Sequence, residues 1–131
     1  MKQLFSLAIL SFLAPFMLVS TARGQSDSAA HVLRHIVVIS FKKDAPADSV
    51  RALDNIYQDL AKSSYVKSFE MGTDISTRDP GVLRHVYTTT FATMDDLKSY
   101  RKMPEYQMLF KVAMAIADEV NAVDYWTGNP G

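Results

Sequence analysis

The sequence contains no cysteine among its 131 residues. This absence excludes disulfides, thiolate metal sites and a cysteine nucleophile. An excess of one charge is also missing, because 14 Lys and Arg balance 14 Asp and Glu and no basic run is longer than Lys42-Lys43. Nucleic-acid binding needs a positive patch for phosphate contacts, so it is not expected. The fold must therefore be held together by packing alone.

Histidine is scarce, and its use follows a pattern. Two of the three histidines stand at the third place of a nine-residue repeat, LRHIVVISF at 33–41 and LRHVYTTTF at 83–91. Both segments are rich in β-branched residues, which favour strands. We interpret the repeat as two buried central strands in equivalent positions of two half-domains. Convergence of two such strands explains the likeness more simply than common ancestry of the halves.

Residues 1–24 have the pattern of a secretory signal peptide. A positive charge precedes a mostly apolar run over 4–19, and small residues surround a cleavage site between Gly24 and Gln25. The run is shorter than the roughly 20 apolar residues that span a bilayer, so cleavage is favoured over a retained anchor. We therefore expect an exported protein, periplasmic or secreted, with a flexible leader over 25–31 and no stable membrane anchor.

The rest of the chain predicts one domain over 32–126 and a tail over 127–131. Apolar periodicity and turn signals predict the order strand, helix, strand, strand, two helices, strand. The expected elements are a strand over 32–41, a helix from Pro46 to about 62–64, a strand over 65–71, a strand over 82–91, a short helix capped by Thr93, a helix from Pro104 to Val120, and a strand over 121–126. The helical apolar stripes are Val50, Leu53, Ile56, Tyr57 and Leu60, then Met94, Leu97 and Tyr100, and lastly Leu109, Phe110, Ala113, Ile116, Ala117 and Val120. The expected face of the second strand is Tyr65, Lys67, Phe69 and Met71.

This order is that of an α+β fold, the ferredoxin-like β-α-β-β-α-α-β sandwich with a four-stranded antiparallel sheet. We expect the two repeated strands to lie side by side and parallel in its middle. The first strand is apolar on both faces, since Val37 and Ile39 alternate with Ile36 and Val38. Helices cover one face of such a sheet, which would leave the other as an exposed apolar patch. We expect a second copy to cover it, giving a homodimeric α/β barrel.

Four segments in their order and spacing resemble the stress-responsive α/β-barrel (Dabb) proteins: RHIVVISFKKDAP, VKSFEMGTDIS, HVYTTTFATMDDLKSY and VDYW. The resemblance covers about Val32 to Tyr125. It implies small ferredoxin-like chains that pair into a dimeric barrel, most of them without an assigned chemistry. A few plant members are cofactor-free polyketide cyclases, whose pocket lies between sheet and helices. The resemblance therefore implies a small hydrophobic or aromatic ligand and no cofactor.

Position by position, the resemblance also implies a set of pocket residues. The candidate ligand-binding residues are His35, Val37, Tyr57, His85, Tyr100, Tyr106 and Asp124. The cyclases' general base is the second histidine of a His-Pro-x-His motif, and here MPEYQ puts Tyr106 at that place. A phenol titrates near pH 10, so proton abstraction by that route is not expected. His35, Tyr100 and Tyr106 remain weak catalytic candidates.

The candidate residues also have ordinary structural interpretations. If the repeated strands are in register, Cβ of His35 and Cβ of His85 are roughly 5 Å apart. Such a pair either binds a ligand, holds a metal or makes structural hydrogen bonds, and a metal needs further ligands that neither histidine has beside it in sequence. No metal is therefore expected. The tyrosines either line a pocket or pack in the core, and Asp124 either accepts a hydrogen bond from Tyr106 or faces solvent.

Three classes of function fit these features. The first is a small-molecule-binding homodimer without catalysis. The second is a cofactor-free enzyme acting on an aromatic or polyketide-type substrate, in the manner of a cyclase or a monooxygenase. The third is a dimer that serves as an interaction module. Tyr106 in place of a histidine favours the first class over the second, and a filled core instead of a pocket would favour the third.

Overall fold

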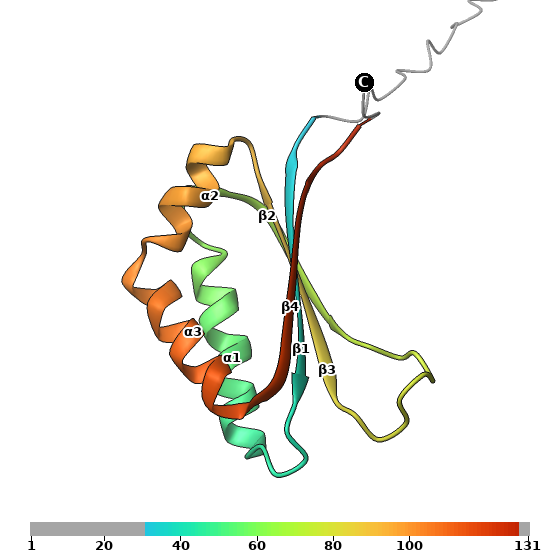
Figure 1. Ribbon diagram of the computed structural model, residues 1–131. Coiled ribbons are helices and arrows are strands. Elements are labelled where there is room, and N and C mark those ends of the chain that lie inside the picture. The colour runs from blue at the N-terminus through green and yellow to red at the C-terminus, as the bar shows by residue number, and fades with distance from the viewer. Residues whose placement is uncertain (1–30, 129–131) are drawn as a thin grey trace, which may run out of the picture.

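The computed structural model describes residues 31–128, so the expected signal peptide, most of the leader and the end of the tail lie outside the described residues. Three helices lie against one face of a four-stranded sheet (Figure 1). The elements are β1 (Leu33–Phe41), α1 (Ala47–Leu60), β2 (Val66–Thr73), β3 (Arg84–Phe91), α2 (Met94–Arg101), α3 (Pro104–Ile116) and β4 (Ala117–Trp126). This confirms the ferredoxin-like α+β fold and its order of elements. Within residues 31–128, no helix is long and apolar enough to cross a membrane.

The strand order is β2-β3-β1-β4, and all neighbouring strands are antiparallel. The repeated segments are adjacent in the middle of the sheet, as expected, but the expectation that they run parallel is wrong. Helix α1 crosses over between β1 and β2 and makes those two strands parallel, so β3, which lies between them, opposes both. His85 therefore stands opposite Ile39, and the residue opposite His35 on β3 is Thr89.

The two apolar faces of strand β1 meet two different environments. Leu33, His35, Val37, Ile39 and Phe41 point toward the helices and are buried. Ile36 and Val38 point to the opposite face and are half-buried. Figure 1 shows the sheet edge-on, with the helices on its left, and within residues 31–128 no helix or strand covers its right face. The two-faced apolar strand thus leaves an apolar surface open.

Helix α1 packs on the sheet through its predicted stripe. Val50, Leu53, Tyr57 and Leu60 are buried, and Ile56 packs against the core from its edge. Thr93 caps α2 as expected, since the backbone N–H of Asp96 donates to its Oγ1 at 3.0 Å. The predicted stripe residues of α2 and α3 are not all buried.

Helix α3 is shorter than predicted, because it ends at Ile116 and the chain passes directly into β4. Ala117 and Val120 pair with Phe41 and Ile39 of β1. A spacing of three residues is typical of a helix, but a register shift between Ser40 and Phe41 lets both residues pair with β1, and this pairing outweighs continued helix. Phe110 is 56 % exposed and Met94 is 39 % exposed, so both are wrong as buried stripe residues.

A bulge in β2 changes which residues face the helices. The register with β3 shifts between Val66 and Ser68, so Val66 lies opposite the buried Phe91 while Phe69 lies opposite Thr89. Val66, Phe69 and Met71 consequently pack against the core. The expectation that Tyr65 and Lys67 share that face is wrong, because one extra residue reverses the alternation.

Candidate ligand pocket between sheet and helices

A pocket of about 220 Å³ lies between the sheet and helices α1 and α3. Its walls are mostly apolar, and polar groups enter from three elements: His35 on β1, Arg101 at the end of α2 and Tyr106 on α3. The other wall residues are Val37, Ile39, Tyr57, Leu109, Phe110, Ala113, Met114, Val120 and Ala122. Apolar walls with a few converging polar groups are the common form of a small-molecule site.

The polar side of the pocket is a chain of three side chains. Asp124 stands directly opposite His35 on the neighbouring strand β4, and Nδ1 of His35 lies 2.5 Å from its Oδ1. Arg101 donates from Nη2 to the other oxygen, Oδ2, at 2.7 Å. His35 is almost completely buried, whereas the Asp124 side chain is 31 % exposed. Sheet pairing therefore fixes the histidine and the aspartate, and α2 brings the arginine.

The charge states follow from these contacts. Burial raises the pKa of Asp124, but the hydrogen bonds from His35 and Arg101 outweigh it and hold that pKa below its usual range. Burial lowers the pKa of His35 more than the Asp124 hydrogen bond and charge raise it. Asp124 is therefore ionised and His35 neutral at neutral pH. An ionised carboxylate only accepts, so the single imidazole proton lies on Nδ1 and points at Asp124.

The second imidazole nitrogen is left as a hydrogen-bond acceptor. Nε2 of His35 is buried and has no hydrogen-bond partner within the described chain. It lies on the opposite side of the ring from Asp124, in a residue that lines the pocket. A buried unsatisfied acceptor is uncommon in folded proteins and calls for an explanation. A ligand that donates to Nε2 would supply one.

Tyr57 and Tyr100 keep their phenolic protons at neutral pH and can donate hydrogen bonds. Burial, followed by the charges of Tyr100 and Tyr106, raises the pKa of Tyr57 above its ordinary value. Burial raises the pKa of Tyr100 to about 12. Tyr57 stacks on Tyr87 with ring centroids 3.8 Å apart, and Tyr100 meets Tyr106 edge-on at 5.3 Å. Tyr57 and Tyr106 line the pocket, while Tyr100 and Asp124 support it from behind.

His85 belongs to a separate cluster. Its Nδ1 lies 2.9 Å from Oδ1 of Asp54 on α1, and the buried Tyr87 donates its hydroxyl to the same oxygen at 2.7 Å. His35 is four residues along β1 from the position opposite His85, or about 13 Å at strand spacing. The expected 5 Å histidine pair is therefore wrong, because the strands are antiparallel. Over residues 31–128, no group of three or more histidines and acids is placed to hold a metal.

Comparison with protein-family models shows the family of this chain. The model of the stress responsive A/B barrel domain matches residues 33–127, which is most of the chain. The chain belongs to this family. A stress-response A/B barrel domain-containing protein of Arabidopsis thaliana is 28 % identical over 97 residues, covering 70 % of this chain and 83 % of the relative.

Solved structures share the A/B barrel fold. The hydroxynitrile lyase of Passiflora edulis is similar to this chain with a TM-score of 0.68. Its sequence is 20 % identical, and the match covers 78 % of this chain and 98 % of the lyase chain. A dimeric ferredoxin-like protein of unknown function from Thermobifida fusca has a TM-score of 0.64 with 16 % identity, covering 76 % of this chain and 93 % of its own. At these identities the likeness establishes the fold alone.

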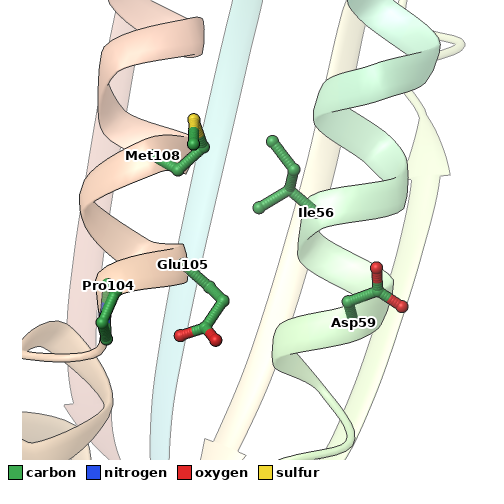
Figure 2. Close-up of a pocket in the computed structure, with 5 residues that line it drawn as sticks. All are labelled: Ile56, Asp59, Pro104, Glu105 and Met108. Atoms are coloured by element: carbon green, nitrogen blue, oxygen red, sulfur yellow. The ribbon is translucent and has the colours of Figure 1, made fainter.

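A second hollow of the A/B barrel domain is less suited to specific binding. A groove of about 230 Å³ lies between α1 and α3. Figure 2 shows Ile56 of α1 and Met108 of α3 facing each other across it, with Asp59 and Glu105 at one end. Asp59 is engaged by Lys62 at 2.7 Å. The groove contains no buried polar group to orient a ligand, although it is slightly larger than the pocket at His35. We therefore place the candidate site at His35.

Two side chains that bond the histidine clusters of the A/B barrel domain, Asp54 and Arg101, escaped the sequence analysis. Asp54 carries a weak signal, because it sits between Val50 and Tyr57 on the inner flank of α1. Arg101 carries none, since an arginine after a buried tyrosine at a helix end is ordinary. The sequence also left Asp124 either bonded to Tyr106 or facing solvent, and the structure instead bonds it to His35 and Arg101.

Proposed function

We propose that this A/B barrel domain is an exported homodimer that binds a small, mostly apolar molecule carrying one hydrogen-bond donor. The observation that carries the proposal is the buried, unpaired Nε2 of His35 in an apolar pocket. Leaving such an acceptor unpaired costs about 1–3 kcal/mol, which a donating ligand recovers.

The pocket volume bounds the ligand. An apolar cavity of roughly 150 Å³ binds benzene, so about 220 Å³ suits a molecule of one or two rings. The walls add dispersion and apolar burial, while His35 selects for a hydroxyl or N–H group. Arg101 is already engaged by Asp124, so a ligand without a negative charge fits best.

Matched ligands test the proposal by calorimetric titration of the mature protein. p-Cresol has the donor and toluene lacks it, while their apolar parts are the same. We expect p-cresol to bind about tenfold more tightly, which corresponds to one hydrogen bond of roughly 1.4 kcal/mol. The preference should disappear in His35→Phe and persist in His85→Gln, a control histidine outside the pocket. Absence of binding by both ligands would contradict the proposal.

The open face of the sheet supports the homodimer. Ile36, Val38 and Val86 are half-buried there, and on β4 Val123 is 57 % and Tyr125 43 % exposed. Solved structures of this fold include chains described as dimeric. A second sheet packed face to face would remove this apolar surface from water.

A charge in that interface tests the dimer. Val38→Asp would bury a carboxylate on each side of the two-fold, where like charges and desolvation both oppose association. Light scattering should report twice the chain mass for the native protein and the single mass, or loss of folded protein, for the variant. Met108→Asp, an equally apolar-to-acidic change at an exposed position of α3 on the helix side of the sheet, is the control. A native monomer at micromolar concentration contradicts the proposed assembly.

The proposed export is supported by the first 24 residues of the sequence. Mass spectrometry of the protein isolated from its natural source should find an N-terminus near Gln25. A full-length chain in the cytoplasm would overturn the export proposal and leave the pocket unaffected.

A further inference from the structure

His35 and Asp124 form a hydrogen-bonded pair of the kind that enzymes use to remove protons. The aspartate accepts from Nδ1 at 2.5 Å and fixes the tautomer, which leaves the lone pair of Nε2 free. When Nε2 takes up a proton, the resulting imidazolium already lies against an ionised carboxylate. A candidate base must then reach the proton it abstracts in a bound substrate.

We propose that His35, oriented by Asp124, is a general base that removes a proton from a carbon next to the carbonyl group of a small ketone bound in the pocket. This inference rests on the proposed binding function and adds a reaction to it, in which an acidic C–H group of the ketone takes the place of the hydrogen-bond donor that faces Nε2. His35 is the catalytic residue, and Asp124 is a positioning residue that acts through it.

The step balances without a cofactor. The C–H bond beside the carbonyl breaks and its proton moves to Nε2 of His35. The electron pair forms the carbon–carbon double bond of an enolate, whose negative charge lies on the carbonyl oxygen. Tyr106 lines the same pocket and is the donor available to that oxygen, because Arg101 is already engaged by Asp124. Return of a proton from Nε2 to the carbon restores both ketone and neutral histidine, so the net result is exchange of the hydrogen with solvent.

The other candidate bases around the pocket are poorly suited to this step. Tyr57 and Tyr100 have pKa values raised by burial, so they keep their protons at neutral pH. Asp124 is ionised but holds its hydrogen bonds to His35 and Arg101. His85 is bound by Asp54 in the separate cluster. Among residues 31–128, His35 alone is shown to combine a neutral form, a free lone pair and a place in the pocket wall.

Charged and titratable side chains from several elements surround His35. They influence its pKa and thereby the lowest pH at which it can act as a base. Asp124 on β4 raises the pKa of His35, whereas burial and Arg101 at the end of α2 lower it, with burial the largest effect. Tyr57 of α1 and Tyr106 of α3 complete the pocket wall. The base therefore stays neutral to a pH below the ordinary histidine value of 6.5.

Hydrogen–deuterium exchange into 2-tetralone tests the proposal. This neutral two-ring ketone has acidic C–H groups next to its carbonyl, and the loss of their proton NMR signals in D₂O gives the exchange rate directly. Binding of 2-tetralone is measured separately by calorimetry on the same mature protein. We expect saturable exchange above the buffer rate, with an acid limb below pH 6.5.

Three variants separate the roles. His35→Gln should lower the exchange rate by about 10²-fold or more, the usual contribution of a general base. Asp124→Asn can present an amide N–H to Nδ1, which puts the imidazole proton on Nε2, so it should lower kcat at least about tenfold with little change in KM. It should also move the acid limb to lower pH, because Asp124 raises the pKa of His35. His85→Gln, matched in residue type but outside the pocket, should exchange at the native rate.

Each of the remaining outcomes refutes a specific part of the proposal. Binding of 2-tetralone with no exchange above the buffer rate refutes the general base and leaves the binding function. Exchange retained in His35→Gln refutes His35 as the base, and an unchanged acid limb in Asp124→Asn refutes the role of Asp124. If His35→Gln does not fold, the Asp124→Asn rate and pH profile decide. Failure of 2-tetralone, p-cresol and toluene alike to bind overturns the proposed function and the base with it.

Discussion

Asp54 holds together two layers of the fold, and its removal gives a stability change that the structure lets us estimate. One carboxylate oxygen accepts from Tyr87 at 2.7 Å and lies 2.9 Å from Nδ1 of His85, so α1 is tied to β3 at a single atom. Tyr87 is buried to 1 % exposure, and burial and Asp54 together hold its pKa above the ordinary value. The hydroxyl therefore keeps its proton and needs an acceptor.

Asp54→Ala leaves that hydroxyl buried without its acceptor, which costs about 1–3 kcal/mol. His85 is partly exposed and can turn to water, so its lost hydrogen bond adds about 1 kcal/mol. We expect a total decrease of about 2–4 kcal/mol in the free energy of unfolding. Asp54→Asn keeps an amide oxygen for Tyr87 and should lose about half as much.

Urea unfolding at one fixed protein concentration measures these changes, since the stability of a dimer depends on concentration. Asp48→Ala is the control, because this aspartate lies on the same helix with its side chain 92 % exposed. Equal midpoints for Asp54→Ala and Asp48→Ala would refute the reasoning, and so would an Asp54→Asn variant that is less stable than Asp54→Ala.

Three further changes have expected outcomes. The pKa of His35 in the folded protein lies below the unfolded value of 6.5, so its contribution to stability is complete above pH 6.5 and is lost as pH falls toward the folded pKa. The urea midpoint should therefore fall less between pH 7.5 and 5.5 in His35→Gln than in the native protein. Equal falls in the two proteins would contradict this. Thr93→Ala removes the cap of α2 and should lower stability by about 1 kcal/mol, whereas Thr93→Ser should restore it. Leu53→Ala opens a cavity at a fully buried position and should lower the free energy of unfolding by about 2–5 kcal/mol. The control Met94→Ala, at a partly exposed position, should change it very little. A decrease below about 1 kcal/mol for Leu53→Ala would show that the surrounding side chains collapse into the cavity.

The sequence predicted the order of elements well because its signals are local. The stripe of α1, the Thr93 cap and the strand-forming repeats each depend on residues a few places apart. The parallel pairing of the repeated strands failed because their likeness was treated as a symmetry, whereas the crossover through α1 determines their direction. The predicted end of α3 was wrong because Ala117 and Val120 continue the helical spacing, whereas pairing with β1 through an irregular register places them in a strand.

The pocket was partly predictable from the family resemblance and not from local pattern. The family resemblance placed His35, Val37, Tyr57 and Tyr106 in one site, and these four residues line the pocket. The bonds from Asp124 to His35 and Arg101 join residues far apart in the chain, and no sequence spacing reveals them. The family resemblance thus indicated part of the pocket wall, while the tertiary structure supplied the partner that fixes its histidine.

The protonation of the His35 ring is the most direct test of the account, since both the proposed binding and the proposed proton transfer need a bare Nε2. Nitrogen-15 NMR of the mature protein labelled at histidine distinguishes the two ring nitrogens at neutral pH. We predict that His35 is neutral, with the proton on Nδ1 and none on Nε2, and that p-cresol shifts the Nε2 signal toward the hydrogen-bonded range. A proton on Nε2, as an imidazolium or as the opposite tautomer, would contradict the account.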